Sequence, residues 1–146
     1  MRHRVGTLEF SGKHFLEISA FIEIGDKGFG KDVIFFAIHE EFNRSRSISM
    51  QLRVNDLFAM SEGMKELLIK NTTSFVKFTK SNDIASKLVF DKIDDKYHLK
   101  MIRNQKMLSM GFDTYYFRAF RTRIISLAKY VERDLYAIQK RRNSYV

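Results

Sequence analysis

The sequence predicts an α+β fold built from two antiparallel ββββα halves about a pseudo-twofold. Apolar and other residues alternate through HFLEISAFIEI, residues 14–24, which is the period of a β-strand. The apolar spacing changes to every third or fourth residue after residue 53, and again after residue 113, as expected for two helices. Each helical pattern follows a series of short strand-like segments. The order of elements in the first half is therefore repeated in the second.

Composition places the chain among single globular domains. It has 146 residues, 45% of them hydrophobic, and neither proline nor cysteine. We expect one domain over residues 1–146, made of two repeats at about 1–70 and 71–146. No apolar run reaches the roughly 20 residues of a membrane span, and MRHRVGTLEF lacks the apolar core of a signal peptide. A cytoplasmic protein without membrane contact is expected.

Four strands are expected in the first half, over residues 5–10, 14–24, 31–41 and 47–52. The glycine-rich segment GDKGFGK and the segment FNRSRS connect them as a hairpin loop and a turn. Asn55 or Asp56 then caps a helix that ends near Lys70. The apolar stripe of this helix consists of Leu57, Met60, Met64, Leu67 and Leu68.

The second half repeats this order. Strands are expected over residues 73–80, 86–93, 96–104 and 106–110, with Asp94 and Asp95 at the middle hairpin. Asp113 or Thr114 caps a helix over about residues 114–140. A shift of sixty residues superposes the two helical stripes. It places Leu57 on Phe117, Met60 on Phe120, Met64 on Ile124 and Leu67 on Leu127.

The order of elements resembles the positive cofactor 4 and Whirly single-stranded-DNA-binding proteins. The local likeness lies in GFGKDVIFFAIHEEFNRSRSISMQLRVNDLFAMSEGM, and FSGKHFLEIS is similar to the Lys-Gly-Lys strand entry of Whirly proteins. There Gly12 and Lys13 match, whereas Ser11 replaces a lysine. The second half departs from the pattern because it has no comparable Gly-Lys hairpin and its helix is longer. The resemblance implies two curved sheets, each crossed by a helix, and fits a small phage-encoded protein working in the host cytoplasm.

Charge favours a polyanionic partner. Residues 1–70 carry ten Lys/Arg and ten Asp/Glu, whereas residues 71–146 carry sixteen and seven, which supplies the whole net charge of +9. Lysines attract phosphates and exposed rings stack on unpaired bases, so strand and turn residues are the candidate nucleic-acid contacts. These candidates are Lys13, Lys27, Phe29, Lys31, Arg44, Arg46, Lys77, Lys87, Lys92, Lys96, Lys100, Arg103 and Lys106. Further rings that interleave with them are Phe15, Phe21, Phe35, Phe75 and Tyr97.

Catalysis, metal binding and cofactor binding find little support. His39 is followed by two glutamates, but neighbours on a strand point to opposite faces. GDKGFGK lacks the spacing and the following helix of a phosphate-binding P-loop. No enzyme activity, metal or cofactor is therefore expected.

The function expected from the sequence is binding of single-stranded DNA with little sequence preference, in replication or recombination. RNA binding is an alternative, because the same chemistry barely distinguishes the two sugars. A structural or adaptor protein is another, because the second helix is longer than one sheet requires. Its apolar rhythm continues through Val131, Leu135 and Ile138. We expect this segment to form a homodimer or homotetramer, with the KRR cluster at 140–142 outside the contact and free to touch DNA or solvent.

Overall fold

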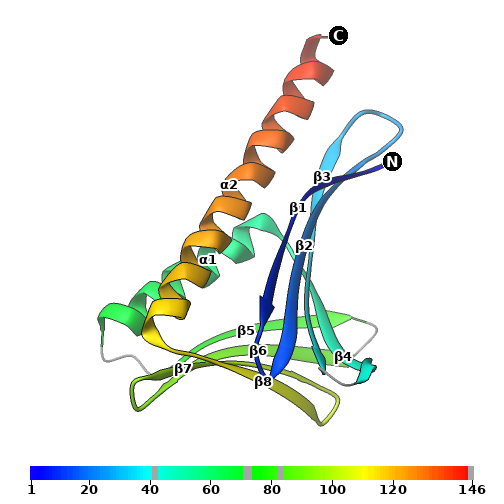
Figure 1. The fold of residues 1–146 in the computed structure, drawn as a ribbon. Helices are drawn as coiled ribbons and strands as arrows, with labels where there is room; N and C mark the ends of the chain where they lie inside the picture. The colour runs from blue at the N-terminus through cyan, green and yellow to red at the C-terminus, as the bar shows by residue number, and fades with distance from the viewer. Residues whose placement is uncertain (41–42, 71–73, 82–83, 145–146) are drawn as a thin grey trace.

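The protein is α+β, with two antiparallel sheets and two helices (Figure 1). The computed structural model describes the backbone of residues 1–40, 43–70, 74–81 and 84–144, and the side chains of 1–40, 46–70 and 84–141. The strands of the N-terminal sheet are β1 (Arg2–Ser11), β2 (His14–Ile24), β3 (Gly30–Glu40) and β4 (Asn43–Leu52). Those of the C-terminal sheet are β5 (Ser74–Ser81), β6 (Ile84–Ile93), β7 (Lys96–Arg103) and β8 (Lys106–Phe112). The helices are α1 (Val54–Ile69) and α2 (Thr114–Ser144).

In both sheets the strands lie in sequence order, each antiparallel to the next. The register places alternate residues on one face, as the period of two requires. Leu8, Ile18, Phe36 and Met50 lie side by side across the N-terminal sheet and face the core. Their core-facing neighbours on β2, β3 and β4 are also buried. In the C-terminal sheet the corresponding row is Phe90–Leu99–Met110. The alternation expected in the first half is therefore confirmed, and the C-terminal sheet shows the same alternation.

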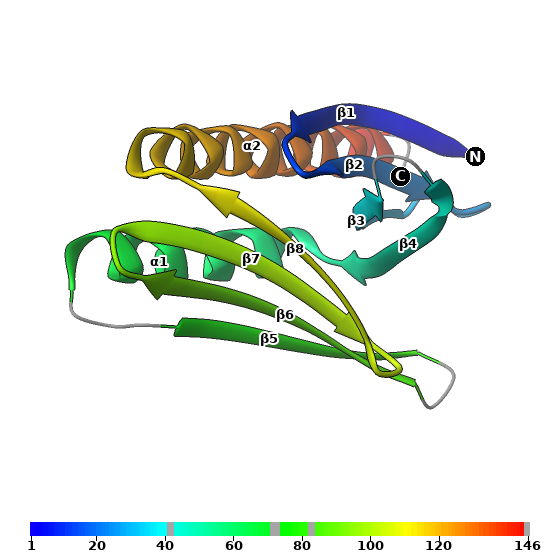
Figure 2. The ribbon, with the colours of Figure 1, turned by 60° about the horizontal axis from the view of Figure 1, so that its bottom comes forward.

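One hydrophobic core joins the two sheets and the two helices. Figure 2 shows α2 along the N-terminal sheet and α1 beside it over the C-terminal sheet. The superposed stripe residues are all buried: Leu57, Met60, Met64, Leu67, Phe117, Phe120, Ile124 and Leu127. The helices also meet directly, since Arg121 Nε donates a hydrogen bond to the Ser61 carbonyl oxygen at 2.8 Å. Residues 61 and 121 are separated by the same sixty positions that superpose the stripes.

Helix α1 begins earlier than expected. Its N-cap is Arg53, not Asn55 or Asp56, and Asp56 instead accepts a hydrogen bond from the Arg53 amide at 2.9 Å. The cause lies on β3, where the carboxylate of buried Asp32 accepts hydrogen bonds from the Val54 amide at 2.6 Å and from Arg53 Nη2 at 2.8 Å. Helix α2 is capped locally as expected, because Asp113 Oδ1 accepts a hydrogen bond from the Tyr116 amide at 2.7 Å.

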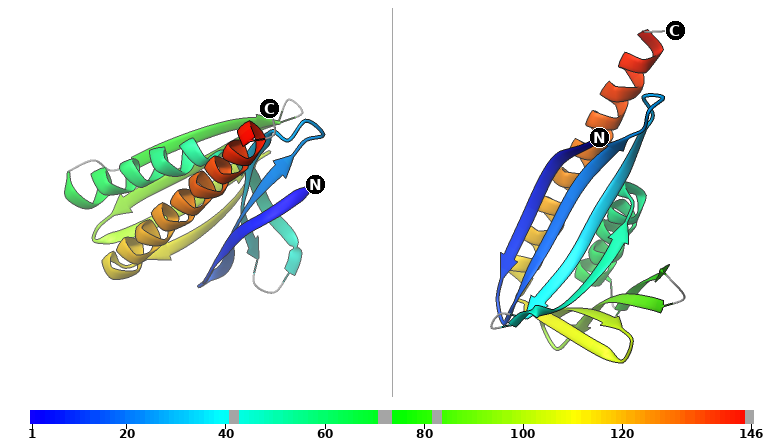
Figure 3. Two further views of the ribbon diagram at one scale, coloured as in Figure 1. Left: turned by 90° about the horizontal axis from the view of Figure 1, so that it is seen from above. Right: turned by 90° about the vertical axis from the view of Figure 1, so that its right-hand side faces the viewer.

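The extra turns of α2 lie against their own chain, which corrects the premise of the predicted self-association. Figure 1 and the right panel of Figure 3 show the helix extending beside β1–β3 toward the β2–β3 turn. Val131 is fully buried, and Leu135 and Ile138 are half-buried. A Cβ atom at Gly30 would lie 3.4 Å from both Leu135 and Ile138. A monomer therefore covers most of this apolar stripe.

Two strand boundaries differ from the expectation by three residues or more. Strand β1 begins at Arg2 rather than at residue 5, because the polar segment Arg2–Arg4 pairs with β2. Strand β4 begins at Asn43, within the segment expected to be a turn. The Asp94–Asp95 turn is confirmed, and Asp94 adopts a positive φ of 48° there.

Candidate nucleic-acid interface

The outer face of the N-terminal sheet, which points away from α2, carries a cluster of rings and guanidinium groups. Phe21 and Phe35 meet edge to face with ring centroids 6.0 Å apart. The Arg2 guanidinium lies 5.2 Å from the Phe21 centroid and 5.5 Å from that of Phe35, and the Arg4 guanidinium lies 5.7 Å from that of Phe21. We call Arg2, Arg4, Phe21 and Phe35 the Phe–Arg cluster. Its rings are half-buried and its arginines exposed.

The cluster follows from the register of the sheet. Arg4 pairs with Phe21, and Phe21 with Val33, so the ring of Phe21 lies beside an arginine and a smaller side chain. Ser19 pairs with Phe35 in the next row along the strands. Rings and cations in neighbouring rows are about 7 Å apart, because two residues separate them on each strand. The face therefore presents stacking surfaces and positive charge side by side.

An open cleft of about 470 Å³ continues the cluster toward the β2–β3 turn. It is lined by Met1, Arg2, Glu23, Ile24, Gly25, Phe29 and Lys31. Phe29 is 53% exposed, and Gly28, in a left-handed conformation at φ 81°, closes the turn that presents it. Glu23 forms an ion pair with Arg2, and the hydrogen bond from Arg2 holds the pKa of Glu23 below its ordinary value. Lys31 adds a second cation to this cleft.

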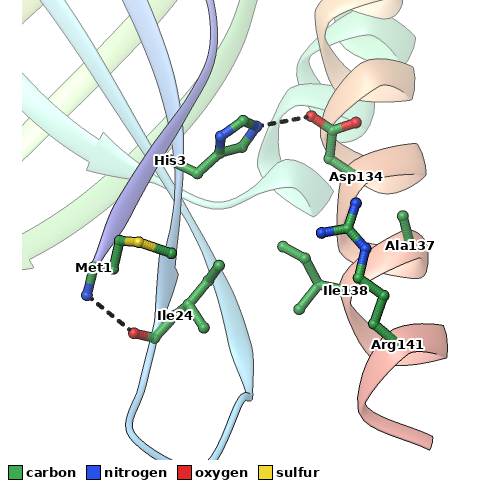
Figure 4. Close-up of a pocket in the computed structure, with 7 residues that line it drawn as sticks. All are labelled: Met1, His3, Ile24, Asp134, Ala137, Ile138 and Arg141. Atoms are coloured by element: carbon green, nitrogen blue, oxygen red, sulfur yellow. Dashed lines mark hydrogen bonds and ion pairs between the residues drawn. The ribbon is translucent and has the colours of Figure 1, made fainter. Parts of the chain in front are cut away.

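A second cleft, of about 210 Å³, adjoins the first and lies between β1 and the C-terminal turns of α2 (Figure 4). It is lined by Met1, His3, Ile24, Asp134, Ala137, Ile138 and Arg141, so the two clefts share Met1 and Ile24. His3 Nε2 lies 3.4 Å from Asp134 Oδ2, which links β1 to α2 across the cleft. The Arg141 side chain extends along α2 toward Asp134. The cleft thus brings another cation to this end of the molecule.

The structure distributes the sequence-predicted contacts over several surfaces. Lys27, Phe29 and Lys31 lie together at the β2–β3 turn, whereas Lys13 lies in the β1–β2 turn and Arg46 on β4. The register puts Lys87, Lys96 and Lys100 on the outer face of the C-terminal sheet, with Arg103 and Lys106 paired beside the β7–β8 turn. Lys92 lies on the inner side, 5.6 Å from the Tyr97 centroid. The side chains of Arg44, Phe75 and Lys77 lie outside the described residues.

Several of these cations already have acidic partners. Lys100 Nζ lies 3.0 Å from Asp91 Oδ2, and Arg46 Nε lies 3.9 Å from Glu40 Oε2. Tyr97, one of the interleaved rings, is buried and stacks on Phe117 with centroids 4.3 Å apart. Phe15 stacks on His39 on the outer face of the N-terminal sheet, with centroids 6.2 Å apart. Among the described rings that the sequence predicted as contacts, those on the surface therefore lie in the N-terminal half, whereas the net charge comes from the C-terminal half.

Sequence reasoning missed Arg2 and Arg4. They lie in a segment whose polar character hides a strand, although they are two residues apart and so share one face of it. That spacing was the available signal. Arg141 belongs to the KRR cluster at 140–142, but its place beside β1 depends on the packing of α2, which no local pattern contains.

The described part of the chain contains neither a cluster of metal ligands nor a membrane-spanning helix. No three His, Asp or Glu side chains there are grouped to hold a metal ion. None of the described helical segments is both long enough and apolar enough to cross a membrane. The sequence matches no family model, and no curated protein matches it either.

Proposed function

We propose that this protein binds single-stranded DNA with little sequence preference, through the Phe–Arg cluster and the cleft beside it. The observation that carries the proposal is the Phe21–Phe35 pair on the outer face of the sheet, with two guanidinium groups over its rings. Solvent-facing strand positions ordinarily hold polar residues. Aromatic rings beside cations are the arrangement that binds unpaired bases and their phosphates.

In the proposed mechanism the rings of Phe29, Phe21 and Phe35 offer stacking surfaces to successive bases. Stacking on one ring contributes about 1–3 kcal/mol per base and tolerates any base. Arg4 and Lys31 neutralise phosphates, and Arg2 adds a third cation once a phosphate competes with Glu23 for it. The net charge of +9 draws the polyanion toward the protein before these contacts form.

The proposal includes the finer description of the fold, two ββββα repeats about a pseudo-twofold as in Whirly proteins. Its support is the meeting of Ser61 and Arg121, because residues that a twofold exchanges touch each other only near its axis. The buried stripes of α1 and α2 obey the same sixty-residue shift. A role in replication or recombination, in the cytoplasm of a cell or a phage host, belongs to the same proposal.

Self-association is a separate proposal. Its first argument, an apolar stripe left wet by the monomer, does not hold, since α2 packs on Gly30 and on the strands beside it. Light scattering at micromolar concentration distinguishes the two states. The mass of a single chain would end the proposal, whereas twice or four times that mass would support it.

Competition of labelled single-stranded DNA, duplex DNA and single-stranded RNA tests the binding proposal. We expect single-stranded DNA to bind tightest. A plot of the logarithm of affinity against the logarithm of salt concentration should have a negative slope of about 0.7 per neutralised phosphate. Tighter binding to RNA would favour the RNA-binding alternative. Tighter binding to duplex, or a flat salt profile, would contradict the proposal, and no binding to any of the three would leave the adaptor alternative.

Matched variants locate the surface. Phe29→Ala should weaken binding by about 1–3 kcal/mol if its ring stacks on a base. Ile93→Ala is the control, because Ile93 is 52% exposed at the end of β6, beside the β6–β7 turn of the other sheet. Equal effects of the two substitutions would remove the β2–β3 turn from the interface.

A further inference from the structure

The outward side of α2 carries a row of cations and tyrosines that the proposed interface does not use. Tyr115, Arg118, Thr122, Lys129, Arg133, Tyr136 and Lys140 are all exposed. At 3.6 residues per turn these positions fall within about 60° of one another, nearly opposite the buried stripe. We call this set the α2 row. From Arg118 to Lys140 it runs about 33 Å at 1.5 Å per residue.

The charge of α2 is unbalanced. The helix holds eight Lys/Arg and two Asp/Glu, a net charge of +6, which is two thirds of the charge of the whole chain. Asp134 is engaged by His3 across the cleft and by Arg133, whose Nη2 lies 3.3 Å from Asp134 Oδ1. Glu132 is the other acidic residue among the 31 residues of α2. Such a helix repels itself, and bound anions would relieve the repulsion.

The tyrosines indicate more than a solvated surface. Tyr115, Tyr116, Tyr130 and Tyr136 are 51–78% exposed, whereas the described tyrosine outside α2, Tyr97, is buried. The Arg133 guanidinium lies 4.7 Å from the Tyr130 centroid, so cation and ring form one unit. Exposed rings interleaved with cations are the combination that contacts single-stranded nucleic acid.

The α2 row and the Phe–Arg cluster lie on opposite sides of the molecule. Helix α2 contacts β1, β2 and β3 on the inner face of the N-terminal sheet, and the cluster is on the outer face. The right panel of Figure 3 shows the sheet with α2 behind it. One strand held on the outer face therefore leaves the α2 row accessible.

We infer that the α2 row is a second binding surface for single-stranded DNA, so that one molecule holds two strands at once. This rests on the proposed function for the first strand. Charge complementarity favours phosphates as the partner. The exposed rings favour unpaired bases, which stack on them, over a duplex, whose bases are already stacked. Two strands held by one protein would meet at a raised local concentration, the condition for annealing.

A two-strand capture assay tests the inference with the full chain. Biotinylated oligothymidine is immobilised and loaded with protein, and a fluorescent oligothymidine, which cannot pair with the first, is added after washing. We expect the second strand to be retained, with salt-dependent affinity. The variant Lys129→Glu with Arg133→Glu should reduce the salt slope of second-strand binding by about 1.4, because two phosphates are no longer neutralised and each contributes about 0.7. Binding of the first strand should stay as it is.

The control is Lys65→Glu with Lys70→Glu on and directly after α1, which changes the net charge equally at exposed positions. Weaker retention of the second strand by the α2 variant, while the control retains it as the wild type does, supports the inference. Retention and a salt slope in the α2 variant that equal those of the wild type overturn it. If the first strand binds and no second strand is retained, the inference fails alone; if the first strand does not bind, the proposed function fails. A variant that loses binding to phosphatidylserine vesicles but keeps the second strand would assign the row to a membrane surface instead.

Discussion

The two helices of this protein have matching buried faces and opposite outer faces. Both bury the same stripe positions, offset by sixty residues, against the shared core. The outer face of α1 belongs to a helix with three Asp/Glu and one Lys, a net charge of −2. That of α2 belongs to a helix with a net charge of +6 and nearly twice the length. The two helices thus share the buried apolar stripe that packing requires, and they differ in net charge.

The difference shows that folding alone does not explain α2. Helix α1 has the pairing usual for exposed helices, with Lys70 Nζ 3.7 Å from Glu66 Oε1 at i,i+4 spacing. In α2 the same spacing joins two like charges, Lys129 and Arg133, and Glu132 and Asp134 are the two acidic residues that offset eight Lys/Arg on this helix. This excess of positive charge is unfavourable for the isolated protein and fits an anionic partner. The α1 surface is therefore the built-in control for every experiment on α2.

The largest expected effect tests what the helices share. Leu67→Ala and Leu127→Ala each remove a buried stripe residue, so each should lower the free energy of unfolding by about 2–5 kcal/mol. Urea unfolding followed by circular dichroism measures both. If one variant has the stability of the wild type, its helix does not pack as described, and the comparison between the two helices fails.

The second prediction uses the different ways in which the two helices are capped. Asp32→Asn should cost about 1.5–3 kcal/mol, because it removes the charge from a buried carboxylate that accepts hydrogen bonds from Arg53 and Val54. Asp113→Asn should cost only a few tenths of a kcal/mol, because asparagine is nearly as good an N-cap as aspartate. Thermal unfolding of the two variants compares them directly, and equal losses would show that Asp32 acts as an ordinary local cap.

The same residue gives a pH dependence. Burial raises the pKa of Asp32, but the hydrogen bonds from Arg53 and Val54 more than offset this, so the pKa lies below its ordinary value. Since the folded-state pKa is lowered, the stabilisation is fully present above the unfolded pKa, about 3.9. It is lost as the pH falls through the folded pKa. Asp32→Asn should flatten this part of the acid unfolding curve; an unchanged slope below pH about 4 would contradict the assignment.

Much of the fold could be predicted from the sequence because its signals are local. Alternation in Leu16, Ile18, Ala20 and Ile22 identifies a strand wherever one face meets a core. The start of α1 could not be predicted, because its determinant is Asp32, twenty-two residues away on another strand. The packing of the extra turns of α2 could not be predicted for the same reason. Their apolar stripe needs a partner, and the partner is the β2–β3 end of the same chain.

Less of the candidate site could be predicted. Phe29, in a glycine-rich turn, is a candidate from sequence alone because a ring at a loop tip has little core to join. The rings of Phe21 and Phe35 are candidates too, but their grouping with Arg2 and Arg4 could not be predicted, because it depends on the register that sets Arg4 beside Phe21. Residue type alone selects the strand lysines, and the structure shows that Lys100 has an acidic partner and that Lys92 lies on the inner side. Periodicity in the sequence predicts the strands and helices. The residues that share a binding surface depend on how these elements pack, which the sequence pattern does not contain.

The smallest expected effect separates stability from binding on the two helices. Lys129→Glu places a glutamate four residues before Arg133, which replaces a like-charge pair by a favourable one, but it also turns the favourable Lys129–Glu132 pair at i,i+3 spacing into a like-charge pair. Because each change is about 0.2–0.5 kcal/mol and the two are opposite in sign, the free energy of unfolding should stay within about 0.5 kcal/mol of the wild-type value. Lys65→Glu makes a like-charge pair with Glu62 without such an offset, and should lower the free energy of unfolding by about 0.2–0.5 kcal/mol. Urea unfolding at low salt measures both, and high salt should reduce both differences, since both positions are exposed. A Lys129→Glu protein that has the stability of the wild type but retains less of the second strand would show that Lys129 serves binding and not folding. If this variant is instead less stable than the wild type, Lys129 has a structural role, and weaker retention of the second strand could no longer be assigned to binding alone.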